Sequence, residues 1–347
     1  MFESVFRKMR ECAYPLYIWG NGSMAHVVYN KLQKEGVDVC GYFVNVDMQY
    51  AEQHEDILPC LTLAQLKEQG KDFAVVMGHG HIELLPEIQQ EALVKAVYMI
   101  PNPYDYYLPD KDVVRYAFSG GIDEVAPYFA DQESRDNLWA YFAVHSGQER
   151  EFYQTIRKLK GMFLPDVWKL REEEVYYDIG AWNGDTVREF LVASNGSYRA
   201  IEAFEPDAEA VRTLRHSVAG QRDIHCHKMG IAGVQGTMQM HGGGIQSNYL
   251  QAAEDGDTPV CRLDDLTDAL LPPTLIKIGV PRLMFDILRG GEKTIRKYKP
   301  RLLTGIVWNW GEDIFAIIKW IRKTNPEYKM ALRYRLLMPT QLWLYAY

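Results

Sequence analysis

The fold of this chain is decided by the stretch Val175-Tyr-Tyr-Asp-Ile-Gly-Ala-Trp-Asn-Gly-Asp-Thr186. Its first residues are typical of a buried strand, its glycines at 180 and 184 predict a tight turn, and a helix is expected from about Thr186. Glycine allows a ligand to approach the backbone closely, and the first turn of a helix attracts polar or anionic groups. The stretch therefore predicts a strand, a turn and a helix with a ligand site at the turn.

A second segment, Ala203-Phe-Glu-Pro-Asp207, places a carboxylate at the end of the next expected strand. Glu205 follows the glycine turn by about twenty residues, the separation at which an α/β nucleotide fold holds a ribose with an acid. The paired oxygens of an ionised carboxylate accept hydrogen bonds from both ribose hydroxyls. The two segments together predict a bound cofactor of adenosine type. The alternative is an ordinary α/β turn with incidental acids.

The composition favours a soluble protein with two domains. The chain has 347 residues, of which 47% are hydrophobic and 24% are charged. Its net charge of −8 argues against a nucleic acid or an anionic membrane as partner, because both need a basic surface. Five scattered cysteines without a CxxC pair argue against a disulfide framework or a zinc site and favour the reducing cytoplasm. No signal peptide or membrane span is expected, and a homo-oligomer remains open.

Alternating strands and helices predict an α/β protein with two Rossmann-like, doubly wound sheets joined by a helical segment. We expect an N-terminal domain at 1–115, a helical connector or cap at 116–163, and a second α/β domain at 164–347. The strands expected in the first domain are 16–19, 37–44, 73–77 and 96–100. Those expected in the second are 175–179, 200–204, 224–228, 275–278, 302–307 and 341–347. Helices should follow the first, second, fourth and fifth of these, and 236–249 should form a hairpin or a mobile loop.

The first domain carries a motif of its own, Gly20-Asn-Gly-Ser-Met-Ala25, between an expected strand and a helix. This is the context of a dinucleotide fingerprint, with its carboxylate displaced to Asp47 or replaced by Asn45. The alternative is a tight turn that binds nothing. His79 and His81 follow a further strand, where open α/β sheets bind ligands. Two histidines without a third ligand nearby are more typical of a loop, so no metal is expected.

From about Phe163 to Tyr347 the chain resembles the FkbM-type methyltransferases, which use S-adenosylmethionine. The resemblance covers roughly half of the chain, and the matching segments occur in the family's order. They are Asp178-Ile-Gly-Ala-x-x-Gly-Asp-Thr186, Ala203-Phe-Glu-Pro-Asp207, Arg262-Leu-Asp-Asp265, Ile276-Lys-Ile278, Gly290-Gly-Glu-x-x-Ile295, Lys299-Pro300 and Trp343-Leu-Tyr-Ala346. Residues 14–105 resemble, less closely, the Rossmann-like module that precedes such domains in sugar- and polysaccharide-modifying proteins.

The resemblance implies S-adenosylmethionine as cofactor and a small-molecule or saccharide acceptor that is methylated on a hydroxyl oxygen. Asp178 is expected to accept a hydrogen bond from a cationic amino group, and Glu205 to hold the ribose. Residues at the end of the third strand would flank the adenine. The cofactor-binding residues expected in this way are Asp178, Gly180, Ala181, Gly184, Asp185, Glu205, Gly230 and Ile231.

The chain departs from the family at the end of the fourth strand. There the family pattern Ile-Lys-x-Asp-x-Glu-Gly places two carboxylates beside the transferable methyl group. Gly279 and Pro281 stand at the two carboxylate positions of this chain, and Arg282 stands at the glycine. Loss of both carboxylates argues against a divalent metal, since magnesium requires oxygen ligands. The chain is then either a methyltransferase with other catalytic residues or an inactive cofactor-binding or scaffolding module. A third hypothesis places the working site of a nucleotide-sugar enzyme in the first domain.

Other residues near this site have open roles. Lys277 lies between apolar neighbours on a strand and is either a functional cation or a residue that reaches solvent. Trp308 and Trp310, near the family's Tyr-His position, would stack on a sugar ring or pack in the core. Each candidate base also has an ordinary explanation as a loop, packing or solvated helix residue. The candidate bases are His241, Tyr249, Asp286 and Glu312.

Overall fold

The computed structural model of the protein divides into two compact units. The first unit consists of Met1–Leu108, Ala140–Ile156 and Leu336–Pro339, and the second of Pro109–Trp139, Arg157–Arg335 and Thr340–Tyr347. The domain boundaries at 115 and 163 remain a prediction. The residues that the structure describes are 5–45, 58–79, 84–100, 109–146, 148–157, 159–163, 166–241, 249–253, 255–307, 314–336 and 338–347.

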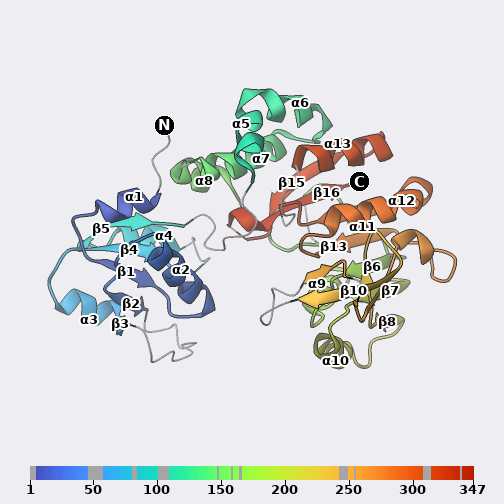
Figure 1. The fold of residues 1–347 in the computed structure, drawn as a ribbon, viewed down its shortest axis with the longest axis horizontal. Coiled ribbons are helices and arrows are strands. Elements are labelled where there is room, and N and C mark those ends of the chain that lie inside the picture. The colour runs from blue at the N-terminus through green and yellow to red at the C-terminus, as the bar shows by residue number, and fades with distance from the viewer. Residues whose placement is uncertain are drawn as a thin grey trace. The chain divides into compact units, whose positions relative to one another are not determined.

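The first unit contains a five-stranded parallel sheet with the order β3-β2-β1-β4-β5 (Figure 1). This is the strand order of a doubly wound nucleotide-binding sheet. Ile18 in the central strand pairs with Tyr42 on one side and Val76 on the other. The elements are α1 Val5–Arg10, β1 Leu16–Trp19, α2 Ser23–Lys34, β2 Gly41–Val44, β3 Cys60–Thr62, α3 Leu63–Glu68, β4 Phe73–Met77, α4 Leu85–Gln89 and β5 Val94–Tyr98.

Neighbouring residues of each strand point to opposite faces of this sheet, and both faces are covered by helices. Ile18 packs on one face with Ala25 and Val28 of α2, whereas Trp19 packs on the other face with Leu66 of α3 and Ile88 of α4. The prediction of a doubly wound sheet is therefore confirmed. The second strand is shorter than expected, since it begins at residue 41 rather than 37, and the strand at 60–62 was not expected.

A helical segment follows the first unit's sheet, as predicted. It is interrupted near Gly120, whose φ of +130° breaks the helical conformation. The first half of α7 packs on the second unit, where Asn137 donates a hydrogen bond to the carbonyl of Leu332 at 2.9 Å. Arg333 adds hydrogen bonds to Asp131 and to Ser134. The elements are α5 Lys111–Tyr116, the π-helical turn Ala117–Gly121, α6 Ile122–Val125, the 3₁₀ turn Ala126–Tyr128, α7 Gln132–His145 and α8 Glu149–Thr155.

The second unit is built on a seven-stranded sheet with the order β15-β16-β14-β13-β6-β7-β8. The strands from β14 to β8 are parallel; helices connect β6 to β7, β7 to β8 and β13 to β14, whereas the small sheet lies between β8 and β13. Helices follow the first, second, fourth and fifth strands, as predicted. The elements are β6 Val175–Ile179, α9 Asp185–Ala193, β7 Ala200–Phe204, α10 Ala208–Ser217, β8 Ile224–His227, β13 Leu275–Ile278, α11 Met284–Gly290, α12 Glu292–Tyr298, β14 Arg301–Thr304, α13 Ile314–Thr324, β15 Met330–Tyr334 and β16 Leu342–Ala346.

One edge of this sheet is antiparallel. β16 pairs with β14 and with β15, so that the last strand lies between two earlier ones. β15 was not predicted, because Arg333 interrupts its apolar sequence. In the structure this arginine is only 1% exposed, and its guanidinium is neutralised by Asp131 and Asp166 at 2.6 and 2.9 Å.

A smaller four-stranded sheet with the order β11-β10-β12-β9 follows β8 in the chain. β10 and β11 are antiparallel, with His241 opposite Tyr249. This confirms the hairpin expected in this region; its residues 242–248 lie outside the described part of the chain. The elements are β9 Gly230–Ile231, β10 Gly236–His241, β11 Tyr249–Gln251 and β12 Thr258–Cys261, followed by the 3₁₀ turn Leu263–Asp265.

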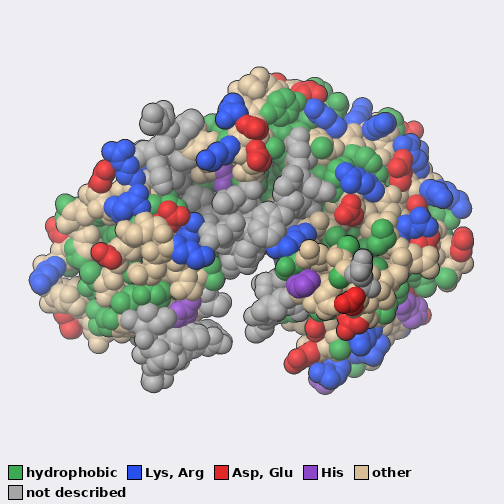
Figure 2. Space-filling model, in the orientation of Figure 1, with side chains coloured by type: hydrophobic (Ala, Val, Ile, Leu, Met, Phe, Trp, Pro, Cys, Tyr) green, Lys and Arg blue, Asp and Glu red, His purple; other side chains and the backbone are tan. Residues whose placement is uncertain are grey.

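On the face of the second unit shown in Figure 2, basic and acidic side chains are interspersed. Among the residues that the structure describes, no helix combines the length and the apolar character that crossing a bilayer requires.

Candidate functional site

The candidate site lies at the carboxyl ends of β6, β7 and β13. The strand order reverses beside β6, and open α/β sheets bind ligands at such a point. After β6 the chain turns at Gly180, whose φ of +79° lies in the left-handed region. The N–H groups of Gly180 and Ala181 both donate to the carbonyl of Phe204 at 3.0 Å. These bonds fasten the turn to the end of β7.

The second glycine of the turn is required by space as well as by conformation. Gly184 has a φ of +83° and precedes α9, which begins at Asp185. A Cβ atom at this position would lie 2.5 Å from Oγ of Ser217. The carboxylate of Asp185 accepts a hydrogen bond from the N–H of Thr186 at 2.8 Å. Asp185 is thus bound to the first turn of its own helix.

Glu205 lies at the end of β7 and is held by the glycine turn. Its Oε2 accepts the N–H of Trp182 and its Oε1 accepts the N–H of Asp207, both at 2.9 Å. The side chain is only 9% exposed, and burial raises the pKa of Glu205, which the two N–H donors partly offset. Each carboxylate oxygen keeps a further lone pair. This geometry suits a carboxylate that accepts two neighbouring hydroxyl groups.

Asp178 has partners within the protein. Lys277 of β13 donates to Oδ1 of Asp178 at 2.9 Å and to the carbonyl of Gly180 at 2.8 Å. The hydroxyl of Thr186 donates to Oδ2 of Asp178 at 2.5 Å. Asp178 is fully buried and Lys277 is 3% exposed. The expected cationic partner of Asp178 is therefore Lys277 in the structure, and its contact with a cofactor stays a prediction.

The segment that departs from the family packs directly on the glycine turn. A Cβ atom on Gly180 would lie 2.8 Å from the carbonyl oxygen of Gly279 and 3.0 Å from a methyl group of Val280. Two residues later Arg282 has a φ of +68°, and its guanidinium carbon lies 3.6 Å from the ring centroid of Tyr249. The segment thus connects the turn to the β10–β11 hairpin.

The β10–β11 hairpin also lies close to the segment that carries Glu205. A Cβ atom on Gly230 would lie 2.6 Å from a methyl group of Leu250 and 3.9 Å from the ring of Pro206. Pro206 follows Glu205 directly, and Glu205 accepts the N–H of Trp182 in the turn. The glycine turn, the end of β7, β9, the hairpin and the 279–282 segment are therefore connected by contacts into one group. The sequence-predicted residues Gly180, Ala181, Gly184, Glu205, Gly230, Ile231 and Tyr249 lie on these elements.

The candidate bases do not all belong to this site. The rings of His241 and Tyr249 stack at 5.5 Å between centroids, so both lie on the hairpin beside Arg282. Asp286 lines a separate cavity and forms an ion pair with Arg289 at 3.4 Å. Glu312 lies outside the described residues, as do Trp308 and Trp310. Within the described ranges, no group of three or more His, Cys, Asp or Glu side chains could hold a metal ion.

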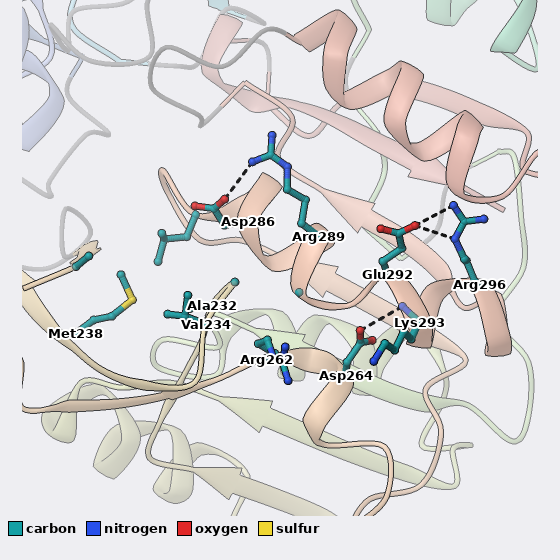
Figure 3. Close-up of a pocket in the computed structure, with 14 residues that line it drawn as sticks. Ala232, Val234, Met238, Arg262, Asp264, Asp286, Arg289, Glu292, Lys293 and Arg296 are labelled. Atoms are coloured by element: carbon teal, nitrogen blue, oxygen red, sulfur yellow. Dashed lines mark hydrogen bonds and ion pairs between the residues drawn. The ribbon is translucent and has the colours of Figure 1, made fainter.

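A cavity of about 650 Å³ lies beside the hairpin, between the small sheet and the helices α11 and α12 (Figure 3). Three of its basic side chains form ion pairs: Arg262 with Asp265, Arg289 with Asp286 and Arg296 with Glu292. The residues that line it are Ala232, Gly233, Val234, Met238, Ala252, Arg262, Asp264, Leu283, Asp286, Arg289, Gly290, Glu292, Lys293 and Arg296.

The motif of the first unit forms a tightly packed turn. Gly20 has a φ of +106°, and a Cβ atom on Gly78 would lie 2.9 Å from Cβ of Ala25. The ring of His79 packs against Trp19 at 4.6 Å. These contacts support the structural interpretation of the motif. Asp47 and His81 lie outside the described residues.

Three contributors to the site were not expected from the sequence. The hydroxyl of Thr186 reaches Asp178 across the glycine turn, whereas the N–H of Trp182 and the guanidinium of Arg282 contact other segments of the chain. The φ of +44° at Trp182 reflects the tight turn.

The fold and the site define an α/β protein with a glycine turn and a buried carboxylate at the switch point of its second sheet. The structure is similar to that of the methyltransferase FkbM from Methylobacillus flagellatus KT, with a TM-score of 0.71 and 18% sequence identity. The match covers 100% of this chain and 94% of that one. At this identity the likeness shows a common fold, and it confirms the expected FkbM-type methyltransferase fold.

Two further solved structures are similar to about half of the chain. Fibrillarin from Aeropyrum pernix with bound S-adenosyl-L-methionine has 11% identity and a TM-score of 0.33, covering 52% of this chain and 70% of that one. Precorrin-6y C5,15-methyltransferase from Geobacter metallireducens GS-15 has 10% identity and a TM-score of 0.32, covering 56% and 94%. These scores are too low to carry an argument. No protein-family model and no curated protein matches the sequence.

Proposed function

We propose that the protein binds S-adenosylmethionine and transfers its methyl group to a hydroxyl oxygen of a sugar or polysaccharide precursor. The observation that carries the proposal is the carboxylate of Glu205, buried at the end of β7 and oriented by the N–H groups of Trp182 and Asp207. The methyltransferase fold supports the same cofactor. The saccharide acceptor rests on the resemblance of the sequence.

The residues present fit the proposed cofactor. Glu205 would hold the two ribose hydroxyls, and the apolar side chains near Gly230 would border the adenine. When bound, the cofactor supplies an electrophilic methyl group on a sulfonium sulfur. The protein then has to align the acceptor hydroxyl with that methyl group and remove one proton. We assign the proton to His241 or Tyr249, because both lie on the hairpin that contacts the 279–282 segment.

The segment 279–282, which lacks the two carboxylates of the family pattern, favours a second function. Gly279 and Pro281 supply no carboxylate, and Gly279 packs against Gly180 at close range. A protein that kept the cofactor pocket and lost transfer would serve as a binding or scaffolding module. The five free cysteines support a cytoplasmic location for either function.

Calorimetric titration with S-adenosylmethionine tests the cofactor, using the unmodified protein and Glu205→Ala. We expect binding by the unmodified protein and a loss of about tenfold or more in the variant, since a hydrogen bond to a charged group is removed. Asp207→Ala is a poor control because it caps α10 through its own side chain. Glu209→Ala, on the first turn of the same helix, is the better control. Absence of heat from the unmodified protein would reject the proposal.

Turnover distinguishes the two functions. The protein is incubated with S-adenosylmethionine and candidate nucleotide sugars, and S-adenosylhomocysteine is measured. Formation of S-adenosylhomocysteine that depends on the acceptor and on Glu205 would support transfer. Cofactor binding without turnover on any acceptor would favour the binding module.

A further inference from the structure

The cavity between the small sheet and the helices α11 and α12 is lined by polar and apolar side chains from several elements (Figure 3). Helix α11 contributes Asp286 and Arg289, and the segment after β12 contributes Arg262 and Asp264. Met238 of β10 adds an apolar surface. None of the residues assigned to the cofactor lines this cavity, so its space is open to a second ligand.

The ion pairs at the cavity leave hydrogen-bonding capacity for a ligand. Arg289 is joined to Asp286 by a single contact, from Nη1 to Oδ1 at 3.4 Å, and the two side chains are 53% and 47% exposed. Arg262 uses Nε and Nη2 for Asp265, so its Nη1 is not engaged by that pair. A carboxylate only accepts hydrogen bonds and a guanidinium only donates them. The cavity therefore presents acceptors and donors next to each other.

This mixture of groups matches hydroxyls better than it matches anions. Each hydroxyl donates one hydrogen bond and accepts others, so it can contact a carboxylate and a guanidinium together. An anionic group on a ligand only accepts, and it would be repelled by Asp264, Asp286 and Glu292. Met238 and Leu283 are buried and offer an apolar surface to the C–H face of a ring. A neutral saccharide ring has both the hydroxyls and the apolar face.

The cavity and the proposed cofactor site share one face of the β10–β11 hairpin. Met238 lies two residues before Met240, which pairs with Leu250 of β11, so Met238 and Leu250 point to the same face. A methyl group of Leu250 lies 2.6 Å from the Cβ position of Gly230, the residue expected beside the adenine. A ligand in the cavity would therefore be a neighbour of the cofactor across this hairpin.

We propose that this cavity holds one neutral sugar ring of the acceptor, with Asp286 and Arg289 bonded to its hydroxyls and Met238 against its apolar face. Naming the ligand as the acceptor rests on the proposed function, whereas binding of the sugar ring in the cavity does not. The site discriminates against a charged ring through its carboxylates and against an apolar ring through its unmatched polar groups.

Saturation-transfer NMR on the full-length protein tests the site, because it detects weak sugar binding. The neutral probes are the methyl α-glycosides of glucose, mannose and galactose, with glucose 1-phosphate as the anionic probe and cyclohexanol as a ring with a single hydroxyl. Asp286→Ala removes an acceptor from a half-exposed helix position, and Ala252→Trp places a large side chain on the cavity wall from an exposed residue. Glu327→Ala is the matched control, because Glu327 also forms an exposed ion pair, with Lys299, but does not line the cavity.

We expect at least one neutral glycoside to bind more tightly than glucose 1-phosphate and cyclohexanol. Asp286→Ala should weaken that binding about tenfold, since a hydrogen bond to a charged group is lost, and Ala252→Trp should abolish it. Glu327→Ala should equal the unmodified protein. The inference is overturned if no neutral glycoside binds, if glucose 1-phosphate binds more tightly, or if both cavity variants bind unchanged.

A separate titration with S-adenosylmethionine distinguishes this inference from the proposed function. Glycoside binding by a protein that does not bind S-adenosylmethionine would reject the proposed function and keep the sugar site. Binding of S-adenosylmethionine without binding of any glycoside would reject the sugar site alone.

Discussion

The buried ion pair between Lys277 and Asp178 should be essential to the stability of the second unit. Lys277→Met keeps the apolar stem and removes the ammonium, which leaves the carboxylate of Asp178 fully buried with Thr186 as its remaining side-chain partner. Removing one member of a buried ion pair costs about 3–5 kcal/mol, because the other charge is left without compensation. The lost bond to the carbonyl of Gly180 also loosens the glycine turn.

Urea denaturation followed by circular dichroism measures this effect. With a slope of about 1–3 kcal/mol per molar urea, the midpoint should fall by at least ~1 M. Adding Asp178→Asn to Lys277→Met removes the uncompensated charge and keeps an acceptor for Thr186, so it should recover most of the loss. Lys319→Met is the control, since Lys319 forms a 2.7 Å ion pair with Glu124 while 38% exposed, and it should cost less than about 1 kcal/mol.

The reasoning is refuted if Lys277→Met costs no more than Lys319→Met. It is also refuted if the double variant is as unstable as the single one, because the loss would then come from packing rather than from charge. Titration of Lys277→Met with S-adenosylmethionine would show how far the ion pair also supports the affinity of the glycine turn for the cofactor.

Three further predictions concern single residues. Gly184→Ala should lower the free energy of unfolding, measured by urea denaturation, by about 1–3 kcal/mol more than Gly196→Ala does. Both glycines have positive φ, but only at Gly184 would a Cβ atom clash, 2.5 Å from Ser217. Equal losses would contradict the steric argument. Burial raises the pKa of Glu205 above 4.5, so affinity for S-adenosylmethionine should fall as pH drops through that raised pKa, and calorimetry of Glu205→Gln should show weak binding with little pH dependence. Burial lowers the pKa of His145 from 6.5 to about 4, so the folded protein binds fewer protons than the unfolded chain. The free energy of unfolding should thus fall as pH drops from 6.5 towards 4, and His145→Gln should flatten that dependence; an unchanged slope would count against it.

Much of the second unit could be predicted because its elements are coded locally. Strands β6 and β7 are apolar apart from one acid each, Asp178 and Glu202, and Gly180 and Gly184 mark positions where only a residue without a side chain fits. β15 escaped prediction since Arg333 lies within it, and its charge is acceptable only because Asp131 and Asp166 arrive from distant segments.

The sequence by itself determined the α/β class, the glycine turn at 178–185 and the carboxylate of Glu205 at the end of the next strand. These depend on short-range backbone geometry, which each residue type restricts in a known way. The partners were decided only by the tertiary structure: Asp178 is bound by Lys277, 99 residues away, and Arg282 stacks on Tyr249. Such contacts depend on where two strand ends and a hairpin meet in space, and no spacing within one segment specifies that meeting.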